Sequence, residues 1–453
     1  MTTYSKILPY SCYELGHCWE PSCARSSFEI CIISFIESCQ IYGVVYLLTG
    51  LIQLRQMTLE SGKKLLKDYL RSSCFLCLNG CCYIGTFCVL RHLLRHINFV
   101  TASFMPGFLA SVIAILVERP ERRPLLAIYV TNVATESLWN TAVEYGYARN
   151  IPRGEILIFV GTMMVLGYYY RSSKPLSKMI NTALQFFFGH NESGRMIDSR
   201  NVSPAPEPIS SRPSHLTWVQ RLLAVFTKKH SRCPHKKGCV PHFLGTALWG
   251  FSQGFLFQLC LKVLPSIPHL IRSPGKLLPL VRSKGNVNAG LFVAWFSAFF
   301  KGTCCVGRWW HGKDKPSHGV LAGALAGLAM YFYSAPTIAL YLMWKTFEGL
   351  YKKGCDAGYL PQIPGSVEFL YCLSTGYLFH TAVIDCRNLK PSYKHFLGRL
   401  TWERMFQYNR HLLDGYGFES GIGFEHYWPP YQQELLSDYV RKRTADFLKS
   451  KNI

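Results

Sequence analysis

Charged residues are scarce in this chain of 453 residues: Asp, Glu, Lys and Arg together make up 17% of it, against about 25% in soluble domains. Apolar residues make up 49% and gather in ten segments. Each segment is long enough, or nearly so, to cross about 30 Å of hydrocarbon. The sequence therefore predicts an all-α multi-pass membrane protein with about ten apolar helices, at residues 28–53, 74–94, 101–117, 124–143, 155–170, 243–264, 287–310, 319–333, 336–351 and 367–384.

The chain also lacks the common catalytic fingerprints. It has no phosphate-cradling glycine loop, no serine-elbow motif, no HExxH and no dinucleotide fingerprint. We therefore expect no enzyme activity, no catalytic residues and no cofactor. No secretory leader or retention signal is visible at the two ends, which favours an organelle membrane over export.

Acidic residues are fewer than basic ones, 26 against 49, which gives a net charge of +23. The excess lies mainly in connections between apolar segments, as at Lys63, Lys64 and Lys67. Basic loops beside apolar spans fit anionic lipid head groups. We therefore expect the lipid bilayer as a partner and no nucleic acid. Because Lys and Arg are abundant in loops on both sides of any ten-span arrangement, they do not fix its orientation.

An internal repeat organises the chain. Residues 106–152 match residues 318–364 without a gap, with 14 identities in 47 positions, including Pro124 on Pro336 and Glu136 on Glu348. This predicts two pseudo-symmetric repeats of five segments each. An odd number of crossings in each repeat inverts the second copy relative to the first, and an even number leaves them parallel.

The expected organisation has five parts. A cysteine-containing lead (1–27) precedes the first membrane repeat (28–189). A polar flexible linker (190–242) follows, in which Trp218, Leu222, Val225 and Phe226 indicate an amphipathic helix. The second membrane repeat (243–404) contains the glycine-rich helix, and an extramembrane tail (405–453) closes the chain.

Glu136 and Glu348 form a candidate pair of intramembrane polar groups, because they occupy equivalent positions in both repeats. A carboxylate inside a membrane needs a partner, a proton or water. One interpretation is that the two face a shared central cavity, and the other is that each lies near a helix end and simply snorkels to the membrane surface or caps the helix. Glu37, Asn79 and His380 are weaker candidates of the same kind. Gly319, Gly323 and Gly327 recur every four residues, which predicts close packing against another helix.

Two short runs combine cysteine with histidine. The first holds Cys12, His17, Cys18 and Cys23, and the second holds Cys233, His235, Cys239 and His242. Neither run has the paired C-x2-C spacing of a structural zinc site. Metal binding, a Cys18–Cys23 disulfide and simple packing of the chain on the bundle all stay open here, and we expect no metal site. The cysteines inside apolar segments, Cys88 among them, are interpreted as small buried hydrophobes.

The run SCYELGHCWEPSC, the segment ending in FCVLRHLL, the stretch PGFLASVIAILVERPERRPLLAIYVTNVATES and the later LKPSYKHFLGRLT together resemble the transmembrane protein 135 family. The glycine-rich second repeat is more loosely similar to the mitochondrial inner-membrane translocase superfamily. The first resemblance implies a protein of mitochondrial and peroxisomal membranes. It also implies a role in mitochondrial fission through a dynamin-related GTPase and in peroxisome and lipid homeostasis, without known catalytic residues.

Two functions are therefore expected. The first is regulation of mitochondrial fission and of peroxisome and lipid homeostasis, with the dynamin-related GTPase as partner. The alternative is a transporter or channel for a lipid or small solute, built at the interface of the two repeats.

Overall fold

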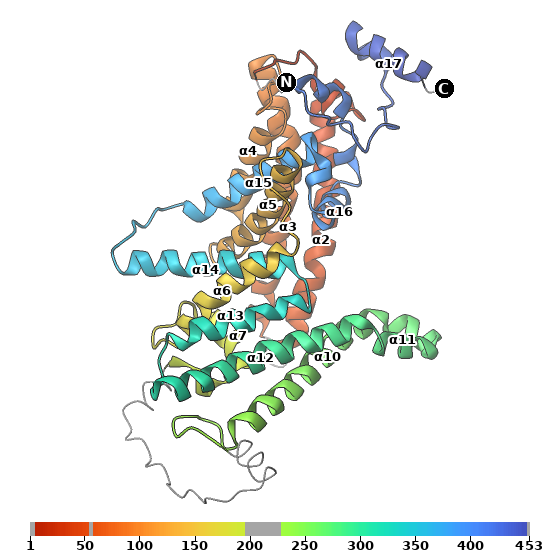
Figure 1. Cartoon of the computed structure of the whole chain (residues 1–453). Coiled ribbons are helices and arrows are strands. Elements are labelled where there is room, and N and C mark those ends of the chain that lie inside the picture. The colour runs from red at the N-terminus through yellow and green to blue at the C-terminus, as the bar shows by residue number, and fades with distance from the viewer. Residues whose placement is uncertain (1–4, 54–57, 195–227, 451–453) are drawn as a thin grey trace, which may run out of the picture. The chain divides into compact units, whose positions relative to one another are not determined.

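The computed structural model describes residues 5–53, 58–194 and 228–450 (Figure 1). These residues form helices joined by loops, with one isolated antiparallel bridge between Leu8 and Ile97. The predicted all-α class is confirmed. The amphipathic helix expected around Trp218 lies outside the described residues.

The chain divides into two compact units, and the second is inserted in the first. Unit 1 comprises Met1–Asn150 and Ile363–Ile453, and unit 2 comprises Ile151–Gln362.

Unit 1 is built on an antiparallel pair of long helices, α2 and α3. Helix α4 packs on α3, and α15 packs on both α4 and α5. Its helices are α1 (Cys12–Leu15), α2 (Cys23–Ile52), α3 (Leu59–Leu94), α4 (Phe104–Val117), α5 (Arg123–Glu144), α15 (Ser366–Ile384), α16 (Pro391–Leu400) and α17 (Asp438–Ser450), with 3-10 turns at Cys386–Asn388, Arg404–Phe406, Arg410–Tyr416 and Gln433–Leu435.

Unit 2 is built on a second long pair, α10 and α12. Helix α13 packs on both α12 and α6, and α14 also packs on α6. Its helices are α6 (Gly154–Tyr170), α7 (Lys178–Phe188), α10 (Cys239–Arg272), α11 (Leu277–Val281), α12 (Lys284–His311), α13 (His318–Gly327) and α14 (Pro336–Asp356), with 3-10 turns at His190–Glu192, Pro274–Lys276 and Leu328–Tyr331.

The boundaries of the two units differ from those of the predicted repeats. Helix α6 belongs to the first repeat by sequence, yet it packs on α13 and α14 in unit 2. Helix α15 belongs to the second repeat by sequence, yet it packs on α4 and α5 in unit 1. Each unit therefore contains the fifth apolar segment of the other predicted repeat. The repeat itself stays a prediction.

Five of the described helices are long and apolar enough to cross a membrane. They are α2, α3, α10 up to Ile267, the stretch Leu277–His311 that joins α11 to α12, and α15. Three apolar helices are shorter: α4, α6 and the stretch His318–Tyr331. Helices α5 and α14 fall in neither group, so ten crossings stays a prediction.

The glycines of α13 lie against the backbone of α6. A Cβ at Gly319 would overlap the carbonyl oxygen of Gly167, and one at Gly323 would overlap that of Met163. At Gly327 it would come within 2.8 Å of the Val160 Cα. Close approach of two helix backbones gains dispersion contacts that larger side chains would prevent. The glycine-rich stretch therefore has its partner helix within unit 2.

The N-terminal lead and the C-terminal tail pack on one another in unit 1. Glu14 is 2% exposed, and its carboxylate accepts hydrogen bonds from the backbone N–H groups of Ser11 and Ser437, both at 2.7 Å. The Asn409 N–H donates to the carbonyl oxygen of Leu15 at 3.1 Å. The Arg91 guanidinium, near the end of α3, donates to the carbonyl oxygen of Tyr10 at 2.6 Å. Lead, tail and the end of α3 therefore lie at the same end of unit 1.

We predict that epitope tags at the N- and C-terminal ends of the chain face the same aqueous compartment, because lead and tail are joined by these polar contacts. Protease protection of the two tags in sealed membranes that contain the chain, and after detergent permeabilisation, measures this. Cleavage of one tag with full protection of the other in sealed membranes would contradict the arrangement.

Candidate functional site

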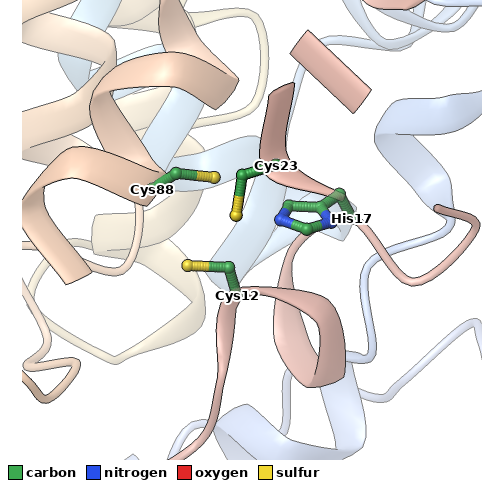
Figure 2. A group of neighbouring side chains, drawn as sticks. All are labelled: Cys12, His17, Cys23 and Cys88. Atoms are coloured by element: carbon green, nitrogen blue, oxygen red, sulfur yellow. The ribbon is translucent and has the colours of Figure 1, made fainter. Parts of the chain in front are cut away.

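Unit 1 brings three thiols and one imidazole together beside the N-terminal lead (Figure 2). Cys12 lies in α1, His17 in the following loop, Cys23 at the first residue of α2 and Cys88 in the last third of α3. Their ligand atoms all lie within 4.8 Å of one another. We call this group the first Cys3His cluster.

Local capping positions these residues. In α1, the Ser11 hydroxyl accepts from the Glu14 N–H and the Glu14 carboxylate accepts from the Ser11 N–H, which is a capping box. Ser22 caps the start of α2 by accepting from the Arg25 N–H. Because α2 and α3 are antiparallel, the start of α2 lies beside the end of α3, where Cys88 is.

The His17 ring is held by its Nδ1, which lies 2.7 Å from the carbonyl oxygen of Glu20. Because a carbonyl only accepts, Nδ1 carries the proton and Nε2 keeps a lone pair. Among the described residues Nε2 is buried without a hydrogen-bond partner. A buried ring nitrogen with a free lone pair, beside three sulfur atoms, is suited to coordinate a metal ion.

Unit 2 contains a second Cys3His cluster, formed by Cys233, His235, Cys239 and Cys305, with all ligand atoms within 4.8 Å. The Cys233 sulfur lies 3.8 Å from the sulfurs of both Cys239 and Cys305. His235 Nε2 lies 3.4 Å from the Cys305 sulfur, and its Nδ1 lies 2.5 Å from the carbonyl oxygen of Lys237. The histidine is thus held in the same way as in the first cluster.

One thiol in each cluster is acidic. The hydrogen bond with Cys88 is the largest cause that lowers the pKa of Cys12, to about 5, and it outweighs burial, which acts in the opposite direction. The hydrogen bond with Cys305 likewise lowers the pKa of Cys233 to about 3. The lowered pKa of each thiol favours the thiolate, the form of cysteine that binds metals.

The clusters include some predicted residues and omit others. Cys18 is outside the first cluster: its sulfur contacts the carbonyl oxygen of Glu14 and the Tyr431 hydroxyl, both at 3.5 Å, and burial raises its pKa to about 12. His242 stacks on His235 with ring centroids 4.3 Å apart and is outside the second cluster. Neither Cys18 nor Cys23 takes part in a disulfide.

Sequence reasoning missed Cys88 and Cys305, which it interpreted as buried hydrophobes. A signal was present. Each precedes an arginine by three residues, Arg91 and Arg308, near the end of the second long helix of its unit. Each also follows the last cysteine of its short run by nearly the same interval, 65 residues from Cys23 and 66 from Cys239.

The predicted pair Glu136 and Glu348 is placed in two different units. Glu136 forms an ion pair with Lys390 at 2.6 Å within unit 1, and Glu348 pairs with Lys345, one helical turn earlier, within unit 2. Both carboxylates are partly exposed, at 24% and 40%. Each therefore has a local cationic partner.

The weaker polar candidates are hydrogen-bonded between elements of unit 1. The Glu37 carboxylate accepts from the Arg399 guanidinium and from the Trp402 indole, both at 2.9 Å. The Asn79 side-chain oxygen accepts from the Tyr371 hydroxyl at 3.2 Å, and His380 Nδ1 lies 2.8 Å from the Ser103 hydroxyl.

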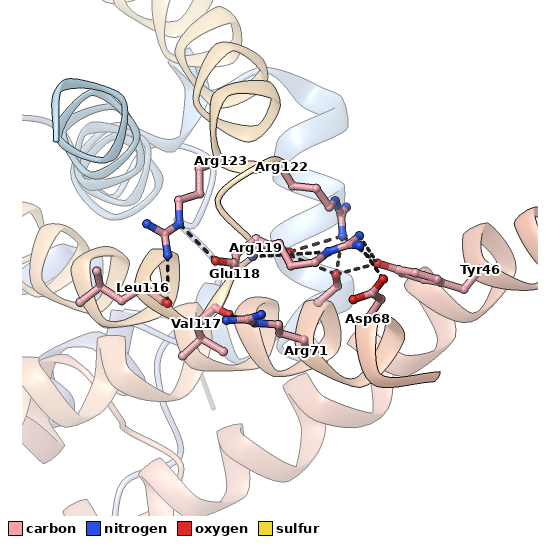
Figure 3. A network of polar contacts seen from close by, with 10 residues as sticks. Tyr46, Asp68, Arg71, Leu116, Val117, Glu118, Arg119, Arg122 and Arg123 are labelled. Atoms are coloured by element: carbon pink, nitrogen blue, oxygen red, sulfur yellow. Dashed lines mark hydrogen bonds and ion pairs between the residues drawn. The ribbon is translucent and has the colours of Figure 1, made fainter. Parts of the chain in front are cut away.

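A polar network fills the turn between α4 and α5 (Figure 3). Glu118 is fully buried, and its carboxylate accepts from the Ser72 hydroxyl at 3.5 Å and from the Arg119 N–H at 2.9 Å, while Arg122 lies 3.4 Å away. Arg119 continues the network to Asp68 on α3, at 2.5 Å, and to the Tyr46 hydroxyl on α2, at 3.1 Å. The network thus joins the turn to the long helical pair.

The same network satisfies the carbonyl groups that end α4. The Arg71 guanidinium donates to the carbonyl oxygen of Val117 at 2.5 Å, and that of Arg123 donates to Leu116 at 3.2 Å. The last carbonyl groups of a helix have no partner within it. Arginine donors therefore satisfy two of the carbonyl groups that end this short apolar helix.

Four buried charged side chains form a ring of ion pairs in unit 2. Arg171 pairs with Glu192 at 2.6 Å and with Asp314, and Arg308 pairs with Asp314 at 3.0 Å and with Glu192. All four side chains are at most 4% exposed. Positive and negative charges alternate around the ring and cancel. Arg308 also lies 3.9 Å from the sulfur of Cys305, so the ring adjoins the second Cys3His cluster.

Residues 9–143 match the family model for the N-terminal cysteine-rich region of Transmembrane protein 135. The match runs from ahead of α1 almost to the end of α5 and includes all four residues of the first Cys3His cluster. No solved structure matches the chain.

We predict that Asp314→Asn destabilises the protein by about 3–5 kcal/mol, the usual cost of breaking a buried ion pair, because two buried arginines then share one carboxylate. Unfolding of the purified protein in detergent, followed by tryptophan fluorescence, measures the change. The matched control is Asp438→Asn, which removes an exposed partner of Arg441 and costs at most about 1 kcal/mol. Equal effects of the two substitutions would contradict a structural role for the ring.

Proposed function

Since the chain belongs to the transmembrane protein 135 family, we propose that it is a multi-pass protein of mitochondrial and peroxisomal membranes that promotes mitochondrial fission and supports peroxisome and lipid homeostasis. Its partners are the lipid bilayer and the dynamin-related fission GTPase. The observation that carries the proposal is the family match over residues 9–143, together with five helices apolar enough to cross a membrane. The proposed role is regulatory and does not involve catalysis.

We also infer a two-repeat architecture. The helices α2, α3, α4, α5, α6 and α7 and the helices α10, α12, α13, α14, α15 and α16 follow one another in the same order, and both α5 and α14 begin with a proline in their first two positions. The packing of α15 on α4 and α5 corresponds to that of α6 on α13 and α14. These correspondences support the internal match at a constant offset of 212 residues.

Exposed basic side chains offer a docking surface for the GTPase or for anionic lipid beside it. Lys63, Lys64 and Lys67 are exposed on the first turns of α3. Arg25, Lys442 and Lys449 are exposed at the opposite end of unit 1, near the start of α2 and on α17. Because α2 and α3 are antiparallel, these two sets lie on opposite sides of any membrane that the pair crosses. Only one set can face the cytosol.

In cells that lack this chain, we predict longer mitochondria and less fission GTPase on their surface, both restored by the wild-type chain. Two triple variants test the basic surfaces: one changes Lys63, Lys64 and Lys67 to Gln, and the other changes Arg25, Lys442 and Lys449 to Gln. When each is expressed in these cells, we expect one variant to recruit at least several-fold less GTPase than the wild-type chain and the other to recruit as much as the wild type. Each variant is therefore the matched control for the other. Unchanged recruitment and network length in the cells that lack the chain would contradict the proposal.

Transport of a lipid or small solute is the second candidate, favoured by the partly exposed pairs Glu136–Lys390 and Glu348–Lys345. If this function holds, reconstituted protein carries flux that Glu136→Gln with Glu348→Gln abolishes, because the two lysines lose their counter-charges. Exchange of labelled phospholipid between vesicle leaflets measures it, with the exposed Glu434→Gln as the control. Wild-type flux in the double variant, or none in the wild type, would remove this candidate.

A further inference from the structure

We propose that each Cys3His cluster binds one zinc ion, so that the folded chain carries two structural zinc sites. The first is formed by Cys12, His17, Cys23 and Cys88, and the second by Cys233, His235, Cys239 and Cys305. This departs from the expectation of no metal, which was drawn from the spacing within the two short runs alone; neither run contains Cys88 or Cys305.

The ligand chemistry selects zinc. Three thiolates and one imidazole form one of the usual ligand sets of structural zinc sites. Four protein ligands close the coordination shell, and no position stays open for water or substrate. The sites therefore stabilise structure and do not catalyse a reaction. Calcium and magnesium prefer oxygen ligands, which neither set contains.

The distances fit a tetrahedral ion. With Zn–S bonds of about 2.3 Å, tetrahedral geometry places two sulfurs about 3.8 Å apart, and a sulfur and an imidazole nitrogen about 3.6 Å apart. In the second cluster the Cys233 sulfur lies 3.8 Å from the sulfurs of Cys239 and Cys305, and the Cys305 sulfur lies 3.4 Å from His235 Nε2. A disulfide requires sulfurs about 2.05 Å apart, and no rearrangement pairs three cysteines completely.

The histidines of the two clusters are held by the same kind of hydrogen bond. Each histidine has its Nδ1 at a backbone carbonyl oxygen nearby, Glu20 in one case and Lys237 in the other, and its Nε2 among the sulfurs. Zinc-binding histidines usually donate their second ring N–H in this way, which fixes the ring and its tautomer. A histidine that only filled space would need no such fixed orientation in two separate places.

A third group of cysteines differs from the two Cys3His clusters. Cys31, Cys77 and Cys81 also lie within 4.8 Å of one another, but on the facing sides of α2 and α3 and with no histidine. The Cys77 thiol donates to the carbonyl oxygen of Cys31 at 3.3 Å, so its proton already has an acceptor. This group supplies three ligands at most and is not proposed as a site.

Each zinc ion would join the segment ahead of the first long helix of its unit to the end of the second long helix. In unit 1 it joins the N-terminal lead and the start of α2 to the end of α3, and in unit 2 it joins residues 233–239 and the start of α10 to the end of α12. Both clusters supply their ligands in the order Cys, His, Cys and then a distant Cys. Zinc with three thiolates carries a net charge of −1, and the buried Arg308 guanidinium lies beside the second site.

The test is the metal content of the full chain, purified in detergent with a non-thiol reductant and measured by inductively coupled plasma mass spectrometry. We expect about two zinc ions per chain in the wild type, about one in Cys88→Ser or Cys305→Ser, and none in the double variant. The matched controls are Cys18→Ser and Cys304→Ser, which alter buried cysteines next to the sites and keep both ions.

A second measurement keeps the proposal testable if a serine variant fails to fold. The wild-type chain, depleted of zinc and titrated with Co²⁺, is expected to show the visible absorption of tetrahedral cobalt and a thiolate-to-cobalt charge-transfer band, saturating near two equivalents. Three results would overturn the proposal: a wild type without zinc that also gives no cobalt spectrum, equal zinc loss in the control variants, or a disulfide between cluster cysteines in the freshly purified chain.

Discussion

A charge buried among apolar helices must have a partner, and this requirement determines how the short helices of this protein end. An unpaired ion in such a setting costs several kcal/mol. Glu118 pairs with Arg122 and accepts hydrogen bonds from the Arg119 N–H and the Ser72 hydroxyl. The Arg71 and Arg123 guanidinium groups donate to two of the last carbonyl groups of α4. In unit 2 each of the four charged side chains in the ring has two partners of opposite charge. The ring consists of Arg171, Glu192, Arg308 and Asp314. The polar groups at the end of α4 and just after α6 are therefore paired within their own unit.

The long helices were predictable from the sequence because their signal is local. Apolar runs such as 28–53 and 74–94 recur as α2 and α3. The packing of α6 on α13 was predictable only in part. The glycines at Gly319 and Gly323 predict that another helix packs closely there, but they do not identify that helix as α6. Packing between segments about 160 residues apart is a tertiary property, and no local pattern encodes it.

The candidate sites also depend on contacts between residues far apart in the sequence. Cys12, His17 and Cys23 lie close together in the sequence and were candidates on that ground. Cys88 lies beside them only because α2 and α3 are antiparallel. The buried ring takes Arg171 from the residue after α6, Glu192 from a 3-10 turn, Arg308 from α12 and Asp314 from the loop before α13. Only the contact between Arg308 and Asp314 joins residues close in the sequence, so no local pattern predicts the other three contacts. Glu136 and Glu348 were singled out because they repeat, yet each pairs with a lysine of its own unit.

The insertion of unit 2 within unit 1 has a consequence for synthesis. A ribosome releases residues 151–362 before α15 exists, so unit 2 has its complete set of helices while α4 and α5 of unit 1 still lack the helix that covers them. During that interval the newly made chain exposes a surface that α15 later buries, and it depends on lipid or a chaperone to shield it. A stop codon placed after unit 2 would leave this intermediate as the final product, with one bundle finished and the other permanently open.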